Sequence, residues 1–178
     1  MPKPHIFFIV LTSIFLNNTF CIAQTKYKIK SCKIEYTFST GMAKGTKTII
    51  FDNYGNIEKQ IEKLDSDSMT KQITIYRPDS IFTIYPNTMT GTARATFNMD
   101  MDTTLINNQI KKVGEGVFLG KKCEITDFHG FKVWNWNGIV LKKETPFSDK
   151  VYEYATAIDE NYKITIDEFS VPIDIKFE

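Results

Sequence analysis

The chain has 178 residues, with 22 Lys and Arg, 21 Asp and Glu, and a formal net charge of +1. This length fits a single domain, and the near-zero charge argues against a nucleic-acid-binding protein, which normally carries a basic patch. Hydrophobic residues make up 42% of the chain and aromatic residues 13%. These proportions are enough for a packed core, so a disordered chain is excluded.

Residues 1–23 have the pattern of a secretory signal peptide: a short basic start, an apolar run over 6–16, and small residues before a cleavage point after Ala23. We therefore expect an exported protein, periplasmic or secreted, with one β-rich domain over 24–178. The apolar run is shorter than the roughly 20 residues that a spanning helix needs, so we expect no integral membrane segment after cleavage. Acylation of Cys21, which would make a lipoprotein, stays open as an alternative.

Cleavage of the signal peptide would leave two cysteines, Cys32 and Cys123. In an oxidising compartment this pair predicts a disulfide. The bridge would close a long loop, worth about 4 kcal/mol in the chain-entropy model. The alternative is two separately buried thiols, because cysteine is among the residue types most often buried.

The remaining sequence is typical of β structure. From residue 24 onward it has 43 Ile, Val and Thr against nine Leu and Ala, and β-branched side chains favour sheets. Alternation of apolar and polar residues predicts strands within 32–38, 45–51, 57–62, 72–76, 80–85, 122–128, 131–136, 139–144, 151–158, 162–166 and 173–177. Asn137-Gly138 predicts a type I′ hairpin turn. Residues 159–161 predict a second turn, which would pair 151–158 with 162–166.

One stretch has helical spacing instead. Four apolar residues recur at helical intervals over 102–113, and Gly114 supplies a stop signal. The sequence therefore predicts a mainly β (α+β) fold, formed by an antiparallel sheet of about ten strands with one or two short helices.

The sequence offers little for catalysis or metal binding. The single histidine after residue 23, His129, lies in a predicted turn, where an exposed side chain is the simpler interpretation. Cys123, Asp127 and His129 match no common zinc spacing, and Met99 and Met101 lack a third soft ligand for copper. We predict no catalytic residues, no metal and no cofactor.

The strand over 131–136 provides the best candidates for ligand contact. Trp134 and Trp136 are two residues apart and should point to the same face, with Phe131 and Val133 on the other. A strand that is apolar on both faces is covered on both. The cover could be protein core, a helix, a bound apolar ligand or a sugar stacked on the indoles, so these four residues are candidate ligand-lining residues.

Three segments carry a family resemblance: residues 45–55, which end in an Asp-x-Tyr-Gly turn, residues 120–125 followed by 133–142, and residues 167–172. In this order and spacing they resemble a family of exported, mostly uncharacterised bacterial proteins related in fold to the LolA/LolB-like periplasmic lipoprotein carriers. The resemblance implies an incomplete β-barrel, a curved sheet whose concave face holds the helices around an apolar cavity. In the carriers that cavity holds acyl chains. The arginine that the carriers use there has no match in this chain.

These observations together favour an exported, non-enzymatic binding protein that shelters a lipid or acyl chain. Its expected partner is a lipid or an acylated protein, and no nucleic acid. Two alternatives stay open. One is an envelope interaction or structural protein with a filled core and no small ligand. The other is a carbohydrate-binding or hydrolytic protein that uses Trp134 and Trp136.

Overall fold

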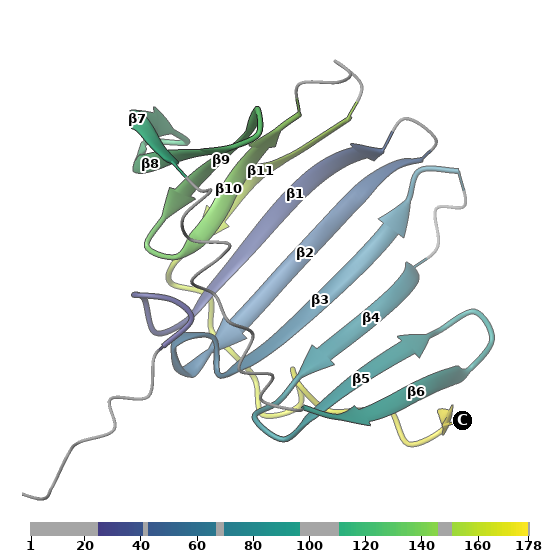
Figure 1. Ribbon diagram of the computed structural model, residues 1–178. Coiled ribbons are helices and arrows are strands. Elements are labelled where there is room, and N and C mark those ends of the chain that lie inside the picture. Colours follow the sequence, from purple (N-terminus) through teal and green to yellow (C-terminus); the bar gives the residue numbers. More distant parts are fainter. Residues whose placement is uncertain (1–24, 41–42, 67–69, 97–110, 146–150, 178) are drawn as a thin grey trace, which may run out of the picture.

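The computed structural model describes residues 25–40, 43–66, 70–96, 111–145 and 151–177. In these ranges the protein is mainly β, and its strands form one open twelve-stranded sheet in the order β12-β6-β5-β4-β3-β2-β1-β11-β10-β9-β8-β7 (Figure 1). The strands are β1 (Cys32–Thr40), β2 (Lys44–Asp52), β3 (Ile57–Leu64), β4 (Thr70–Tyr76), β5 (Ser80–Tyr85), β6 (Thr90–Ala95), β7 (Lys111–Phe118), β8 (Lys121–Phe128), β9 (Phe131–Trp136), β10 (Ile139–Glu144), β11 (Val151–Asp159) and β12 (Lys176–Phe177). Neighbouring strands are antiparallel, except that β12 runs parallel to β6.

The sequence patterns located most of this sheet. Strands β1 to β5 and β8 to β11 lie where the alternation predicts them, and the mainly β class is confirmed. The predicted hairpin turn is also confirmed, because Asn137 and Gly138 both have positive φ angles, +54° and +87°, as a type I′ turn requires. A single 3-10 turn, η1 (Asn53–Gly55), joins β2 to β3.

The predicted helix over 102–113 is wrong at its C-terminal end. Residues 111–113 belong to β7, and the rest of the predicted helix lies outside the described residues. The described ranges hold no α-helix on either face of the sheet. Two glycines in β7 interrupt the strand pattern, and one of them has a packing role: a Cβ on Gly116 would lie 2.5 Å from Cζ3 of Trp134.

The C-terminal part of the prediction also needs correction. Residues 162–166 form no strand; Tyr162 and Ile164 instead pack against a buried cluster that includes Ile50 and Ile75. Of the predicted strand 173–177 only Lys176–Phe177 is a strand. Strand β6 is absent from the predicted strands, since its sequence contains no large apolar side chain.

The first of two apolar cores formed by the described residues lies between β1 and β2 on one side and β8 to β10 on the other. We call it the concave core; its buried members are Tyr27, Cys32, Ile34, Tyr36, Ile49, Phe51, Cys123, Trp136, Ile139, Leu141 and Ala155. In the sheet order, β11, β10 and β9 separate β1 from β8. Side chains from such distant strands can meet only because the sheet curves toward this face, which is therefore the concave face.

The second core lies on the opposite, convex face. Its buried members are Ile50, Ile75, Ile84, Phe169 and Ile175, and we call it the convex core. The last two belong to the C-terminal segment, residues 160–175, which covers this face. Arg77 Nη2 donates a hydrogen bond to the Phe169 carbonyl at 2.9 Å, and Lys59 Nζ donates to the Glu168 carbonyl at 2.9 Å. The C-terminal segment is thus held on this face by hydrogen bonds as well as by packing.

Candidate functional site

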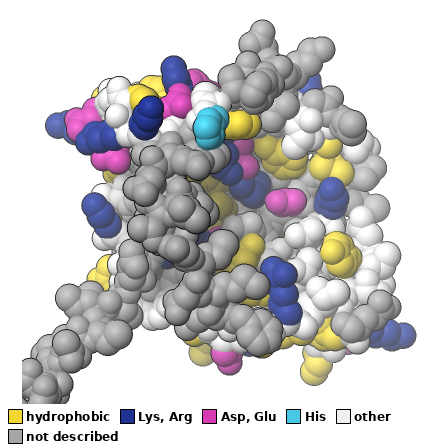
Figure 2. Space-filling model, viewed as in Figure 1, with side chains coloured by type: hydrophobic (Ala, Val, Ile, Leu, Met, Phe, Trp, Pro, Cys, Tyr) yellow, Lys and Arg dark blue, Asp and Glu magenta, His cyan; other side chains and the backbone are white. Residues whose placement is uncertain are grey.

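A pocket of about 330 Å³ opens on the concave face, lined from β1, β2, β3, β4, β10 and β11. Figure 2 shows this face hollowed, with acidic and basic side chains in the hollow. The apolar wall of the pocket comes from Phe38, Ala43 and Leu64. Phe38 lies over Gly45, where a Cβ would stand 2.9 Å from Cζ of the ring and 2.1 Å from a backbone oxygen of β3. The glycine therefore makes room for the aromatic wall.

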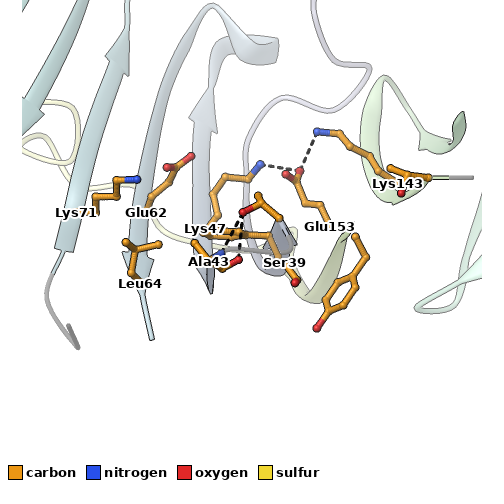
Figure 3. Close-up of a pocket in the computed structure, with 12 residues that line it drawn as sticks. Ser39, Ala43, Lys47, Glu62, Leu64, Lys71, Lys143 and Glu153 are labelled. Carbon is orange, nitrogen blue, oxygen red and sulfur yellow. Dashed lines mark hydrogen bonds and ion pairs between the residues drawn. The ribbon is translucent and has the colours of Figure 1, made fainter. Parts of the chain in front are cut away.

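An ion-pair network forms the polar wall of the pocket (Figure 3). Lys47 Nζ and Lys143 Nζ both contact Oε1 of Glu153, at 2.6 Å and 3.1 Å. The sheet order β2-β1-β11-β10 brings these residues together from distant parts of the sequence. The Lys47 ammonium also lies 5.1 Å from the centre of the Tyr36 ring, a distance at which a cation is attracted to the ring face.

The charge state of Glu153 follows from these contacts. Burial raises the pKa of its carboxyl, but the hydrogen bonds and charges of Lys47 and Lys143 outweigh burial and hold the pKa below its ordinary value. The carboxylate therefore stays ionised at neutral pH. With two ammonium groups on one carboxylate, the network carries one positive charge.

Two further charged residues line the same pocket. Glu62 pairs with Gln72 across β3 and β4, and Lys63 pairs with Thr70, so Lys71 is the extra residue of a β-bulge. A bulge re-aims the side chain that it carries. Figure 3 shows Lys71 and Glu62 projecting into the pocket opposite Glu153.

A second pocket of about 270 Å³ adjoins the first, since both are lined by Lys47, Lys143 and Glu153. It also contains the fully buried side chain of Glu58. Lys26 Nζ and Tyr27 Oη donate to Oε2 of Glu58 at 2.5 Å and 2.7 Å. These bonds compensate the cost of burying a carboxylate.

Tyr27 and Lys26 belong to an N-terminal strap, residues 25–31, which joins two turns of the sheet. The Tyr27 amide donates to the Tyr54 carbonyl at 3.0 Å, and the Lys28 amide donates to the Asn137 carbonyl at 2.9 Å. A Cβ on Gly138 would lie 2.6 Å from the Lys26 carbonyl oxygen. The strap therefore lines the second pocket beside the β9–β10 turn, through Lys26 and Tyr27.

The aromatic residues singled out from the sequence lie elsewhere. Trp136 is buried in the concave core, with the Lys121 ammonium 4.7 Å from its ring centre. Trp134 packs against the same core, and its buried Nε1 has no hydrogen-bond partner among the described residues. Val133 is half-buried and Phe131 is exposed. None of the four lines the two pockets.

The two cysteines also belong to the concave core, but the predicted disulfide is absent from the structure. Both thiols are free and buried. Cys32 Sγ donates to the Lys33 carbonyl at 3.5 Å, and Cys123 Sγ donates to the Lys121 carbonyl at 3.4 Å. Their strands are separated in the sheet by β11, β10 and β9. The arrangement matches the alternative of two separately buried thiols, and burial raises the pKa of Cys32 to about 11.

Other residues named in the sequence analysis lie outside the pockets. His129 is exposed in the β8–β9 turn, with a φ of +52°. In the part of the chain that the structure describes, no group of three or more His, Cys, Asp or Glu is arranged to hold a metal ion. Met99, Met101 and the predicted signal peptide lie outside the described residues.

Within the described ranges, no helix is long and apolar enough to cross a membrane.

The comparisons with known proteins bear on the fold. No family model and no curated protein matches this chain. Among solved structures 38 chains match. One is an uncharacterised conserved protein from Thermus thermophilus, with a TM-score of 0.59 and 7% sequence identity over 84% of this chain and 90% of that chain. At this identity the likeness concerns the fold alone.

Proposed function

We propose that this protein is an exported, non-enzymatic binding protein that holds a lipid or acyl chain on the concave face of its sheet. The observation that carries the proposal is the 330 Å³ pocket, in which apolar side chains lie beside charged ones. Ligand pockets generally measure about 300–1,000 Å³ and combine apolar surface with a few polar groups. An amphiphile fits such a pocket, with its chain on Phe38 and Leu64 and its head near the lysines.

The resemblance to the lipoprotein carriers adds support for an acyl chain as the guest. The charged wall distinguishes this pocket from a purely apolar one, and it suggests a single chain with a polar head at the pocket mouth. The sequence pattern of residues 1–23 supports export.

Two measurements test the proposal. Native mass spectrometry of the protein purified from its own host should show a bound acyl species that organic extraction removes. Calorimetric titration with 1-butanol, 1-hexanol and 1-octanol should show affinity rising roughly fourfold per methylene, because each buried methylene contributes about 0.8 kcal/mol.

A matched pair of variants locates the binding. Ala43→Phe fills the pocket and should abolish alkanol binding. Ala157→Phe places the same side chain on an exposed position of β11 and should leave the affinity unchanged. Equal affinities in the two variants, or an affinity independent of chain length, would count against an acyl-binding pocket.

A second candidate function is that of an envelope interaction protein with no small ligand. The observation that favours it is the exposure of Ile166 and Ile173, 95% and 97%, on the segment that covers the convex face. Large apolar side chains so fully exposed are suited to contact with a partner. This candidate predicts no co-purifying acyl species and no alkanol binding.

A further inference from the structure

The charges around the 330 Å³ pocket are unbalanced. Three lysines, Lys47, Lys71 and Lys143, face two glutamates, Glu62 and Glu153, so the lining carries one net positive charge. The adjoining pocket has the same imbalance, because its three lysines again outnumber its two glutamates. A net charge in a hollow with low-dielectric walls acts more strongly than the same charge on an open surface.

The depth of the network strengthens this effect. The side chains of Lys47 and Glu153 are only 11% and 21% exposed, and interactions between charges grow as water is excluded. Lys143 is half-exposed and lies where the two pockets meet. Its ammonium has three donors, so a head group can bind it while Glu153 stays in place.

Lys71 stands on the other side of the same pocket. It belongs to the bulge of β4, and its side chain is directed into the hollow (Figure 3). Lys71 and Lys143 therefore approach a guest from opposite walls. Phe38 and Leu64 line the same pocket, beside these two ammonium groups.

We propose that the pocket selects amphiphiles with an anionic head group, namely long-chain carboxylates, and that Lys71 and Lys143 bind the head. This inference rests on the proposed function and deepens it by naming the class of ligand. A carboxylate accepts charge-assisted hydrogen bonds from an ammonium group, and its negative charge neutralises the surplus charge of the lining. A cationic head would add to that surplus, and a hydroxyl would leave it unchanged.

The test is a calorimetric titration with three probes that share one chain: octanoate, 1-octanol and octyltrimethylammonium, each below its micelle concentration. Wild type should bind octanoate most tightly and the ammonium compound most weakly. The double variant Lys71→Gln/Lys143→Gln should weaken octanoate binding about tenfold, equivalent to about 1.4 kcal/mol, and leave 1-octanol binding unchanged. Added salt should weaken octanoate binding alone.

Two further variants separate charge from structure. Glu62→Gln removes a negative charge from the lining and should tighten octanoate binding about threefold. Lys122→Gln removes a lysine that is exposed on β8 and lines neither pocket, and should change nothing. Opposite effects at Glu62 and at the lysine pair cannot arise from a general loss of folding.

The outcomes separate this inference from the proposed function. If 1-octanol binds but octanoate binds no better, or if the lysine double variant binds octanoate as wild type does, the anion preference is wrong and the acyl pocket stands. If none of the three probes binds, the proposed function itself fails. Tightest binding of octyltrimethylammonium would overturn the assignment of the head group.

Discussion

The two halves of the sheet place their apolar cores on opposite faces. In one half, β1 and β2 pack against β8 to β10 across the concave face, and aromatic side chains fill the space between them. In the other half, β3 to β5 turn their apolar residues to the convex face, where the C-terminal segment covers them. Strand β2 serves both halves, because Ile49 and Phe51 point one way and Ile50 the other.

This difference explains where the pocket lies. On the concave face of β3, the inward residues are Glu58, Gln60 and Glu62 rather than apolar side chains. The strap buries Glu58, but Gln60 and Glu62 are only partly buried and line the two pockets, so the hollow there can admit a guest. The pocket lies at the boundary between the halves: Phe38 and the ion-pair network come from β1, β2, β10 and β11, whereas Glu62, Leu64 and Lys71 come from β3 and β4.

The largest expected effect comes from emptying the concave core. Phe51→Ala should lower the free energy of unfolding by about 3–5 kcal/mol, and Ile75→Ala, its counterpart in the convex core, by about 2–5 kcal/mol. Both side chains are fully buried. Urea denaturation measures these losses.

Thiol labelling distinguishes the two variants further. Cys32 pairs directly with Phe51, and burial raises its pKa to about 11, so the native thiol should react slowly at neutral pH. At urea concentrations that give the two variants the same free energy of unfolding, Cys32 should be labelled faster in Phe51→Ala than in Ile75→Ala. Equal labelling rates would mean that the two cores open together and do not unfold independently.

A smaller loss of stability is expected when a buried side chain is removed from the segment that covers the convex face. Phe169→Ala should destabilise the protein by about 3 kcal/mol, expose the C-terminal segment to proteases and leave the labelling of Cys32 slow. Ile166→Ala, in the same segment but 95% exposed, should change stability by less than about 0.5 kcal/mol. Similar protease sensitivity of the two variants would contradict the covering role of this segment.

The strap over residues 25–31 should contribute less again. Tyr27→Phe removes the hydrogen bond to the buried Glu58 carboxylate and should cost about 1.5–3 kcal/mol, the usual value for a bond to a charged group. Burial and the charge of Glu58 raise the pKa of Tyr27, so the phenol remains a donor at any neutral or mildly alkaline pH. A variant as stable as wild type in urea would show that this bond does not stabilise the fold.

The smallest effect concerns the ion pairs at the boundary. The folded-state pKa of Glu153 lies below its ordinary value of 4.5, so the pairs stabilise the fold above that pH and lose this contribution as the pH falls through the folded-state pKa. Glu153→Gln should therefore cost about 1 kcal/mol at neutral pH and less in acid. Urea denaturation of both proteins across this pH range measures the difference in their free energies of unfolding. A difference that grows in acid would contradict this prediction.

Local patterns predicted the strands well, because alternation and turn residues act over a few neighbouring positions. The turn at Asn137-Gly138 needs only its two positive φ angles. The errors arose where long-range packing decides the outcome: 162–166 alternates like a strand, but Tyr162 and Ile164 pack against the convex core instead. In β7, the need for glycine at position 116 is explained only by Trp134, whose ring occupies the space of a Cβ there.

The pocket was harder to predict than the strands. Lys47, Lys143 and Glu153 come from β2, β10 and β11, and no spacing in the sequence links them. One signal was available: Lys47 occupies the face of β2 that carries Ile49 and Phe51, where an apolar residue is normal. A charged residue at such a position needs a partner, and the partner comes from a strand more than a hundred residues away.

The amino-acid sequence by itself determined that this chain forms β structure, where most strands and turns lie, and which residues of a strand share a face. Only the tertiary structure decided which of those faces is buried, and against what. Alternation shows that the two faces of β3 differ, with isoleucines on one face and glutamates on the other. It does not show what covers each face. The C-terminal segment covers the first, and the curvature of the sheet encloses the second beside the lysines of β2 and β10. Burial depends on these long-range neighbours, which local pattern does not encode.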